Sequence, residues 1–461
     1  MNKPLRILMV RPRPSPVTIG LQHVMVVEPL ELEVLAALAG PADEVEIVDM
    51  ILEKRDLDHF LRAHDPDVFC VTGYITHIPQ MIDGCRAAKR FKPGCRTVVG
   101  GVQVEKFPED IQDAAVDFRV VRNATVSFPG LLEHFRDPAC APVPPGVLAQ
   151  GEALEEDRLP PYRFDFPIPR RDLTRKYRPS YFYVFHDKVA LIKTSFGCPH
   201  GCSFCFCRKI TDDHYAVRPI AHVIEELQGI HENEIYIVDD DFLVSRERVA
   251  EFLSFLRDRG IRKHYLVYGR ADFIASHPDL IAEFKALGLR TIIIGLESFN
   301  DRELLDYRKG SPAAINDQAM DILNRNGVDC YAAIILSPDW GEEDFVRLRH
   351  KLSELRIEFV NLQPLTPLRG TGLQVEEGRL VVDRADFPRW DLAHVTVRPE
   401  KMTLAEYYGN IITTYRRVLF RPRYILRHLK YPLRMRAKLA KGVWRVSRQY
   451  RRISKEARCP K

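Results

Sequence analysis

The 461-residue sequence has no apolar run that approaches the ~20 residues of a transmembrane helix. It has no signal-peptide pattern at its polar start, and its ten cysteines form no repeated framework that would predict disulfides. These absences exclude a membrane-spanning class and a disulfide scaffold, and we expect a reducing cytosol. With 46% hydrophobic residues, the chain is long enough for about two to three packed domains.

Two common ligand motifs are also missing. No Gly-x-Gly-x-x-Gly follows the first expected strand, which argues against a dinucleotide-binding domain. Structural zinc sites have four ligands, often as two Cys-x₂-Cys pairs, and this chain has no second pair to complete such a site.

One cysteine motif is present and is highly informative. Cys198, Cys202 and Cys205 have the spacing Cys-x₃-Cys-x₂-Cys. Three thiolates can bind three irons of a [4Fe–4S] cluster and leave the fourth iron open, whereas an electron-transfer cluster has four cysteine ligands. His200 and Cys207 are near enough to be considered as a fourth ligand. Because a fourth ligand would close the site, we interpret both as ordinary loop residues.

This loop resembles the signature of the radical S-adenosylmethionine (SAM) enzymes, including Phe204 just before the third cysteine. The resemblance implies that the open iron binds the amino and carboxylate groups of SAM.

Residues 1–135 alternate short apolar runs with amphipathic segments. The expected strands are Arg6–Arg11, Val45–Asp49, Val68–Thr72, Thr97–Gly100 and Phe118–Val121. This alternation predicts a parallel sheet with helices on both faces, in a flavodoxin-like order with a ligand cleft at the carboxyl ends of the strands. The loops at those ends contain the candidate binding residues Thr72, Gly73, Tyr74, Thr76, Gly100, Gly101, Gln103, Arg122 and Asn123.

A doubly wound domain directly before a radical SAM loop resembles the cobalamin-binding domain of the cobalamin-dependent radical SAM enzymes. The resemblance implies that the loop residues above bind cobalamin. The chain departs from related patterns at two places: Gln103 stands where a histidine is common, and His23 lacks the Asp-x-His-x-x-Gly context. We therefore expect neither His23 nor His77 to bind cobalt. A domain that only docks on its neighbour, or that binds a nucleotide, stays open as the alternative.

A second α/β alternation begins at Val189, after a linker rich in proline, arginine and tyrosine. Its six βα units predict a partial (β/α)₆ barrel with its chemistry at the carboxyl ends of the strands. The expected strands are Val189–Thr194, Glu234–Val238, His264–Tyr268, Thr291–Gly295, Val328–Leu336 and Glu358–Leu362. The expected organisation is a cobalamin-binding domain (1–138), a linker (139–187), a radical SAM barrel (188–385) and a C-terminal extension with a basic helical tail (386–461).

Polar residues end several of these barrel strands. By resemblance, acidic residues after the second strand lie near the methionine part of SAM, and a Gly-x-Glu-Ser motif after the fourth lies near its ribose and carboxylate. The resemblance therefore implies a SAM site of Phe204, Asp239, Asp240, Arg270, Glu297 and Ser298. Lys309 is an alternative to Arg270 as the partner of the SAM carboxylate. The other interpretations are a solvated turn for the aspartates and a surface salt bridge for the basic residues.

The resemblance covers about residues 5 to 400 and implies a cobalamin-dependent radical SAM enzyme. Such an enzyme would methylate an unactivated carbon through a 5′-deoxyadenosyl radical and methylcobalamin, with electrons from a donor such as flavodoxin or ferredoxin. Two alternatives stay open: a non-methylating cyclase or ring-rearranging enzyme, and an iron–sulfur RNA-binding or regulatory protein. The sequence does not name the substrate.

The C-terminal tail is strongly basic. Residues 401–461 contain 18 lysines and arginines but two acids, a net charge of +16 in a chain whose total is +5. Three hypotheses suit such a tail with interleaved aromatic residues: a solvated tail, a surface that rests on anionic lipid, and an RNA-binding segment. We predict peripheral contact with the inner, anionic face of the membrane, a small-molecule or lipid substrate, and a cytoplasmic enzyme. Nucleic acid is not the partner we expect.

Overall fold

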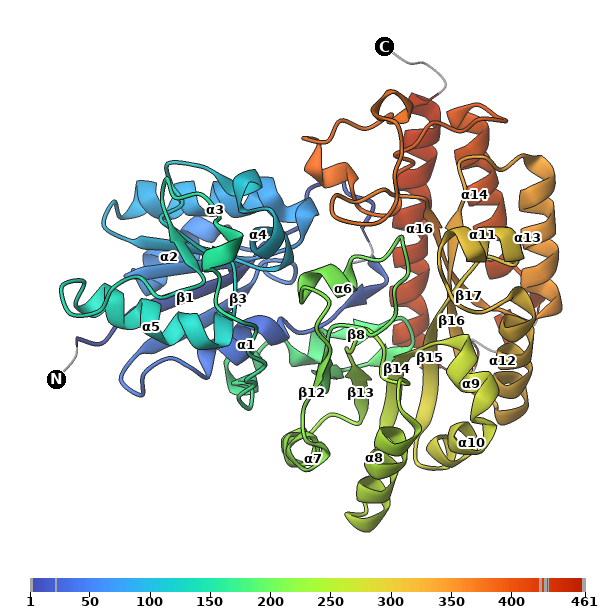
Figure 1. The fold of residues 1–461 in the computed structure, drawn as a ribbon, viewed down its shortest axis with the longest axis horizontal. Helices are drawn as coiled ribbons and strands as arrows, with labels where there is room; N and C mark the ends of the chain where they lie inside the picture. Colours follow the sequence, from blue (N-terminus) through green and yellow to red (C-terminus); the bar gives the residue numbers. More distant parts are fainter. Residues whose placement is uncertain (1–2, 21–22, 423–424, 427–428, 430, 458–461) are drawn as a thin grey trace. The chain divides into compact units, whose positions relative to one another are not determined.

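The computed structural model describes residues 3–20, 23–422, 425–426, 429 and 431–457. The chain forms two compact units (Figure 1). The first unit comprises residues up to Thr18 together with Glu28–Tyr181, and the second comprises Ile19–Val27 together with Phe182–Lys461. Each unit contains its own six-stranded sheet, so the predicted α/β class with two sheets is confirmed.

The first unit has a sheet in the order β3-β1-β4-β5-β6-β7. The strands are β1 (Arg6–Arg11), β3 (Glu44–Asp49), β4 (Val68–Thr72), β5 (Arg96–Gly100), β6 (Phe118–Val120) and β7 (Val147–Ala149). The first five are parallel, and β7 pairs antiparallel with β6 at one edge. The order of the five parallel strands is the predicted flavodoxin-like one, in which ligands bind at the carboxyl ends.

Helices cover both faces of this sheet (Figure 1). They are α1 (Leu30–Ala36), α2 (Leu57–His64), α3 (Ile78–Phe91), α4 (Val102–Lys106) and α5 (Ala124–Arg136). Helix α1 packs beside α5, and α2 beside α3. Helix α3 buries Met81, Cys85 and Ala88 at helical spacing, so its apolar stripe faces the sheet.

The second unit contains the predicted partial barrel, a parallel sheet in the order β10-β13-β14-β15-β16-β17. Its strands are β10 (Val189–Ile192), β13 (Glu234–Ile237), β14 (His264–Gly269), β15 (Leu289–Glu297), β16 (Asp329–Leu336) and β17 (Phe359–Pro364). Strands β10 and β17 are the two edges and, within the described residues, do not pair with each other. The barrel is therefore open on one side.

Helices pack on the outer face of the barrel sheet. They are α7 (Ile220–Gly229), α8 (Arg246–Asp258), α9 (Ala271–Ser276), α10 (Pro278–Ala286), α11 (Asp301–Asp306), α12 (Ala313–Asn326) and α13 (Glu342–Glu354). Five of them place a fully buried side chain in one shared core: Val223, Phe252, Phe284, Leu323 and Phe345. This core fixes the strands whose carboxyl ends carry the candidate site.

Two C-terminal helices complete this unit, α14 (Leu404–Leu419) and α16 (Leu433–Glu456). Thr403 and Glu406 form a capping box that fixes the start of α14. The Tyr450 ring of α16 lies 6.0 Å from the Tyr415 ring of α14. Much of the basic tail is therefore packed structure and not a solvated extension. No described helix combines the length and apolar character that a bilayer crossing requires.

A small sheet closes the amino-terminal end of the barrel. It consists of β2 (Met25–Val26), β8 (Phe182–Tyr183) and β9 (His186–Asp187). The Tyr183 ring lies 5.0 Å from the Tyr236 ring of β13. Nδ1 of His186 lies 2.8 Å from Oε2 of Glu234, at the start of β13. Because side chains fill the amino-terminal end of the barrel, we expect the reaction to take place at the carboxyl ends of its strands.

We expect Glu234→Gln to reduce stability by about 1–2 kcal/mol at pH 7 but to have little effect in acid. Burial opposes the charged carboxylate, yet hydrogen bonding to His186 and the charges of Arg290 and His264 lower the pKa of Glu234 below its ordinary 4.5. A lowered pKa contributes stability that is present above the unfolded-state value and is lost as the pH falls through the folded-state value. The unfolding temperatures of the wild type and of Glu234→Gln should therefore differ at neutral pH and converge below pH 4.5.

Candidate functional site

The cysteine loop leaves the carboxyl end of β10, the first strand of the barrel. It passes through β11 (Ser195–Phe196), which pairs with β12 (Ala216–Val217), and turns at Gly197. Gly197 has a φ of +74°, and a Cβ there would lie 2.1 Å from the backbone oxygen of His214. Only glycine fits such a turn, so the backbone directs the chain into Cys198.

The three predicted cluster ligands, Cys198, Cys202 and Cys205, are half-buried free thiols. Burial raises the pKa of Cys198 to about 12. Burial also raises the pKa of Cys202, against the opposing charges of Lys309 and Arg270. A hydrogen bond with Cys207 lowers the pKa of Cys205. Because the thiolate is the form that binds metal, Cys205 is the thiol whose surroundings most favour binding.

The middle of the loop is held by the segment after α11. The Ser203 backbone N–H donates to the Tyr307 carbonyl at 3.0 Å, and the Ser203 carbonyl accepts from the Gly372 N–H at 2.7 Å. The Phe204 ring lies 5.7 Å from the Tyr307 ring. Tyr307 therefore contacts the loop at Ser203 and at Phe204, a role that no sequence motif signalled.

Asp239 braces the start of the same loop. Its carboxylate accepts the backbone N–H groups of Thr194 at 2.6 Å and Ser195 at 3.0 Å, together with the Thr194 hydroxyl. Its side chain is buried, and burial raises its pKa. The structure thus gives Asp239 a positioning role, and its predicted contact with SAM stays a prediction.

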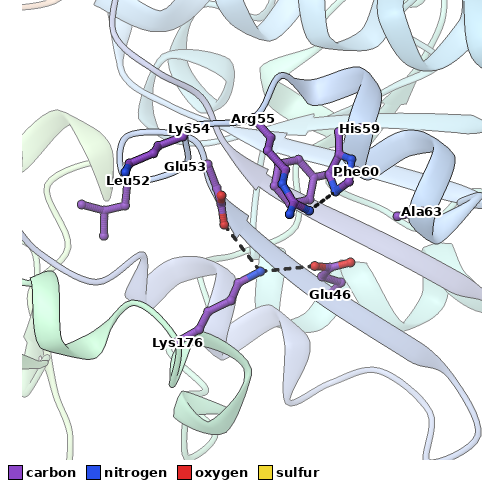
Figure 2. Close-up of a pocket in the computed structure, with 9 residues that line it drawn as sticks. All are labelled: Glu46, Leu52, Glu53, Lys54, Arg55, His59, Phe60, Ala63 and Lys176. Carbon is purple, nitrogen blue, oxygen red and sulfur yellow. Dashed lines mark hydrogen bonds and ion pairs between the residues drawn. The ribbon is translucent and has the colours of Figure 1, made fainter.

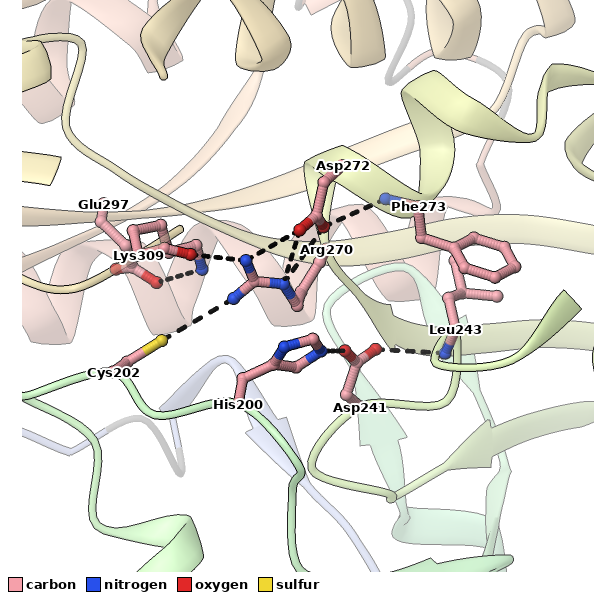
Figure 3. Close-up of polar contacts among 9 residues, drawn as sticks. All are labelled: His200, Cys202, Asp241, Leu243, Arg270, Asp272, Phe273, Glu297 and Lys309. Atoms are coloured by element: carbon pink, nitrogen blue, oxygen red, sulfur yellow. Dashed lines mark hydrogen bonds and ion pairs between the residues drawn. The ribbon is translucent and has the colours of Figure 1, made fainter. Parts of the chain in front are cut away.

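A buried charge cluster lies beside Cys202 (Figure 3). Nη1 of Arg270 lies 3.7 Å from Sγ of Cys202, and its Nη2 donates to the Lys309 carbonyl at 2.5 Å. Nζ of Lys309 lies 3.2 Å from Oε1 of Glu297, and both side chains are 7% exposed. Asp272 also accepts from Arg270. Two cations therefore lie next to the predicted cluster ligand.

The Gly-x-Glu-Ser motif is explained by close packing. Glu297 has a φ of +61°, and a Cβ on Gly295 would lie 2.0 Å from Oε1 of Glu297. Gly295 therefore makes room for the carboxylate to turn back toward Lys309. The Ser298 hydroxyl donates to Glu303, which also accepts from the Trp340 indole at 2.6 Å. Ser298 is thus engaged within the protein, and its predicted contact with SAM is likewise untested.

The remaining acidic residues of the second strand end face the cysteine loop. Nε2 of His200 lies 3.3 Å from Oδ2 of Asp241. A hydrogen bond to Cys205 raises the pKa of Cys207, and burial and the nearby Asp240 charge raise it further. The structure therefore brings Asp240, predicted for SAM, close to the cysteines. It also adds Asp241, which sequence reasoning left out although it belongs to the same Asp-Asp-Asp run.

The donor set of this loop fits an iron–sulfur cluster. Soft thiolate ligands select such clusters, and the three cysteines lie on one short loop. The charges of Lys309 and Arg270 oppose the burial that raises the pKa of Cys202. Within the described part of the chain, no three Cys, His, Asp or Glu side chains are close enough to hold a single metal ion. The fit therefore rests on the donor chemistry and on the spacing of the loop.

In the first unit, the loops after β4 and β5 contact each other closely. Gly101 has a φ of +105°, and a Cβ there would lie 2.7 Å from the Gly73 carbonyl and 2.9 Å from the Thr72 hydroxyl. Thr72, Gly73 and Gly101 thus pack together at the carboxyl end of the sheet, beside Gly100. The three glycines carry no side chain, which lets a flat ligand approach the backbone and fits the predicted corrin.

The other predicted cobalamin residues have separate environments. The Tyr74 side chain is 66% exposed, whereas Thr76 is buried with its hydroxyl 3.2 Å from Nδ1 of His77. Burial lowers the pKa of His77 to about 4, so this imidazole is neutral at pH 7. Gln103 donates to Asp110 at 2.5 Å.

Arg122 and Asn123 hold the segment that follows the sheet. Arg122 donates to the Pro160 carbonyl at 3.3 Å and lies over the Tyr162 ring at 4.1 Å. Asn123 donates to the Pro161 carbonyl at 2.8 Å. The sequence correctly placed these two residues after the carboxyl end of β6, but it did not reveal these hydrogen-bond partners. Their predicted contact with cobalamin stays a prediction.

We expect Gly101→Ala to weaken the binding of hydroxocobalamin at least about tenfold. A side chain at this positive φ costs about 1–2 kcal/mol, and its Cβ would collide with the Gly73 backbone. Absorbance titration of the purified protein measures the affinity. Gly94→Ala is the matched control, because nothing lies within 4 Å of its added Cβ. Equal affinity in both variants would place cobalamin elsewhere.

A separate pocket of about 580 Å³ lies in the first unit (Figure 2). Lys176 pairs there with Glu46 at 3.4 Å and with Glu53 at 3.7 Å. Arg55 lies 2.5 Å from His59. None of the predicted cofactor residues lines this pocket, so it is distinct from the candidate site.

Two family models match the chain. The radical SAM superfamily model matches residues 192–352, which include the cysteine loop and strands β13 to β16. The B12 binding domain model matches residues 18–132, which include strands β3 to β6 of the first sheet. The predicted cofactors, a [4Fe–4S] cluster, SAM and cobalamin, are therefore confirmed.

The chain is also similar to individual proteins. Hopanoid C-3 methylase from Methylococcus capsulatus is 30% identical over 84% of this chain and 75% of that protein. Anaerobic magnesium-protoporphyrin IX monomethyl ester cyclase from Rubrivivax gelatinosus is 24% identical over 55% of this chain and 45% of that protein.

A solved structure of the radical SAM methyltransferase TsrM from Kitasatospora setae, with cobalamin and a [4Fe-4S] cluster bound, has the same fold. Its TM-score is 0.65 at 16% identity, and the match covers 99% of this chain and 100% of that chain. The two domain types, their order and the long match to a methylase agree with one another. The chain belongs to the cobalamin-dependent radical SAM enzymes.

Proposed function

We propose that this enzyme methylates an unactivated carbon of a hopanoid-like polycyclic lipid. The observation that carries the proposal is the 30% identity to hopanoid C-3 methylase, which extends over 84% of the chain. When bound, the cluster and SAM would supply the radical chemistry and cobalamin would supply the methyl group. The protein has to bind these groups, orient them and exclude water.

The side chains suit those tasks. Cys198, Cys202 and Cys205 would hold the cluster, on a loop that Asp239 and Tyr307 keep in place. Arg270 and Lys309 are partly neutralised by Asp272 and Glu297. Both cations would attract the carboxylate of SAM, because charged hydrogen bonds are the strong ones. Phe204, Asp240 and Ser298 are further proposed SAM contacts.

The remaining sequence-based assignments are also proposals. We infer a one-electron donor such as flavodoxin or ferredoxin, since the cluster needs an external electron. We also infer a cytoplasmic enzyme in peripheral contact with an anionic membrane. The nine described cysteines are free, which suits a reducing compartment. The family-model matches at 18–132 and 192–352 lie within the proposed cobalamin domain (1–138) and barrel (188–385).

The test uses the full chain, reconstituted anaerobically with iron, sulfide and cobalamin. Supplied with a reductant, a hopanoid mixture and SAM that carries a deuterated methyl group, it should release 5′-deoxyadenosine and form a lipid that contains the label. Cys202→Ala is the control that should form neither product. Release of 5′-deoxyadenosine with no labelled lipid from any hopanoid would reject the proposed substrate.

A second candidate is a cyclase that forms a ring without transferring a methyl group. The similarity to the magnesium-protoporphyrin ester cyclase, at 24% identity, favours it. The same labelling experiment separates the two functions, because a cyclase would change its substrate without incorporating deuterium from SAM.

A further inference from the structure

Several large apolar side chains are exposed from the end of α14 to the first residue of α16. Phe420 is 70% exposed and Leu433 is 74% exposed, with Ile425, Leu426 and Leu429 exposed between them. We call these five residues the apolar segment. Five large exposed apolar side chains within 14 residues are a candidate binding surface.

Two described residues of this region, Arg421 and Tyr431, contact other parts of the second unit. Nη1 of Arg421 donates to the Leu352 carbonyl at 3.0 Å. The Tyr431 ring stacks on the Phe185 ring at 4.3 Å. The Ile425 N–H donates to the Arg421 carbonyl at 3.1 Å. Arg421 and Tyr431, which bracket Leu426 and Leu429 in the sequence, are therefore both held by contacts within the second unit.

Helix α16 continues the exposed apolar surface. Its inner face packs Met435, Leu439 and Tyr450 into the unit, and a Cβ on Gly442 would lie 2.0 Å from the His23 carbonyl. On its outer face Leu433, Ala437, Ala440 and Trp444 are exposed. Their spacing of four, three and four residues places them on one stripe. The helix thus has one apolar stripe that is buried and a second that is not.

Basic side chains lie along one side of this second stripe. Arg434, Lys441, Arg445 and Arg448 are exposed on the same helix. An apolar stripe beside a row of cations suits a helix that lies in the surface of an anionic bilayer. Single-stranded nucleic acids are instead held by aromatic rings that stack on bases. Four of the five members of the apolar segment are leucine or isoleucine, which favours a bilayer.

We propose that the apolar segment and the outer stripe of α16 insert into the surface of an anionic bilayer. This inference rests on the proposed function in one respect, because a hopanoid-like substrate would reside in the membrane and the enzyme would have to reach it there. The insertion can nevertheless be measured without any methylation.

Tryptophan fluorescence provides a direct measurement. The chain has three tryptophans, of which Trp340 and Trp390 are buried and Trp444 is 59% exposed. Vesicles of phosphatidylglycerol and phosphatidylcholine should shift the emission of the full-length protein to the blue, and brominated lipids should quench it. Trp444→Phe should remove this response while the protein still floats with the vesicles. An unshifted spectrum in wild-type protein that does float would overturn the insertion of α16.

A double variant tests the apolar segment itself. Leu426→Gln with Leu429→Gln leaves the charge unchanged and should weaken vesicle binding at least about tenfold, because two apolar side chains no longer enter the bilayer. Val346→Gln, at an exposed apolar position on α13 that is 50% exposed, is the control and should bind as wild type. Unchanged binding by the double variant would reject insertion in favour of charge attraction alone. Release of the protein from vesicles by RNA would support the nucleic-acid hypothesis and also count against insertion.

The two proposals fail in different ways. If the double variant loses vesicle binding but still methylates a detergent-dispersed hopanoid, both the insertion and the proposed function hold. If wild-type protein inserts into vesicles but methylates no hopanoid, the proposed substrate is wrong and the insertion surface stands.

Discussion

Cys202→Ala should reduce the reductive cleavage of SAM to below detection, and the same holds for Cys198→Ala and Cys205→Ala. Three protein ligands hold the cluster when the fourth iron is left open, so the loss of any one leaves two. Iron content and absorbance after anaerobic reconstitution report the cluster, and chromatography of 5′-deoxyadenosine reports cleavage. The variants should still fold, because the three cysteines are half-buried loop residues outside the barrel core.

Cys207→Ala is the matched control. Cys207 interacts with Cys205 and Asp240, so its removal changes the pKa of one ligand but not the number of ligands. We expect nearly full iron content and an activity that is about 10–100-fold lower, the effect typical of removing a residue that supports a metal ligand. If Cys207→Ala lost the cluster as completely as Cys202→Ala, the open-iron hypothesis would be wrong.

Lys309→Met is expected to lower the stability of the barrel by about 3–5 kcal/mol. Lys309 and Glu297 are each 7% exposed, so removal of the lysine leaves a buried carboxylate without its ion pair. Thermal denaturation of the protein without cofactors measures this change separately from any effect on SAM binding.

The double variant Lys309→Met with Glu297→Gln is the control for this argument. Removing both charges removes the unpaired carboxylate, so most of the lost stability should return. If the double variant were as unstable as Lys309→Met alone, the lysine would act through its packing and not through its charge.

The sheets were predictable from the sequence because their strands are short runs of β-branched and aliphatic residues. The expected Arg6–Arg11 and Val68–Thr72 coincide with β1 and β4, since four consecutive apolar residues in each run are buried on both faces. The three cysteines were predictable because their spacing is local in the sequence. These features need no knowledge of distant contacts.

Long-range contacts explain what the sequence did not reveal. Strand β7 is three residues long and exists because it pairs with β6. The Asp239 carboxylate accepts hydrogen bonds from the backbone N–H groups of Thr194 and Ser195, which lie more than 40 positions away in the sequence. The Glu297–Lys309 pair follows from the positive φ at Glu297, which a motif does not display. Each of these depends on which groups meet in space.

The chain passes between its two units at three places, after Thr18, after Val27 and after Tyr181. Residues 25 and 26 supply a strand to the sheet that contains β8, although they lie within the span of the first unit. A single cut therefore cannot separate the halves without removing that strand from its partner. In evolutionary terms, one recombination event could not exchange either half for that of a relative. The two halves should have diverged together, so their family trees should have the same branching order.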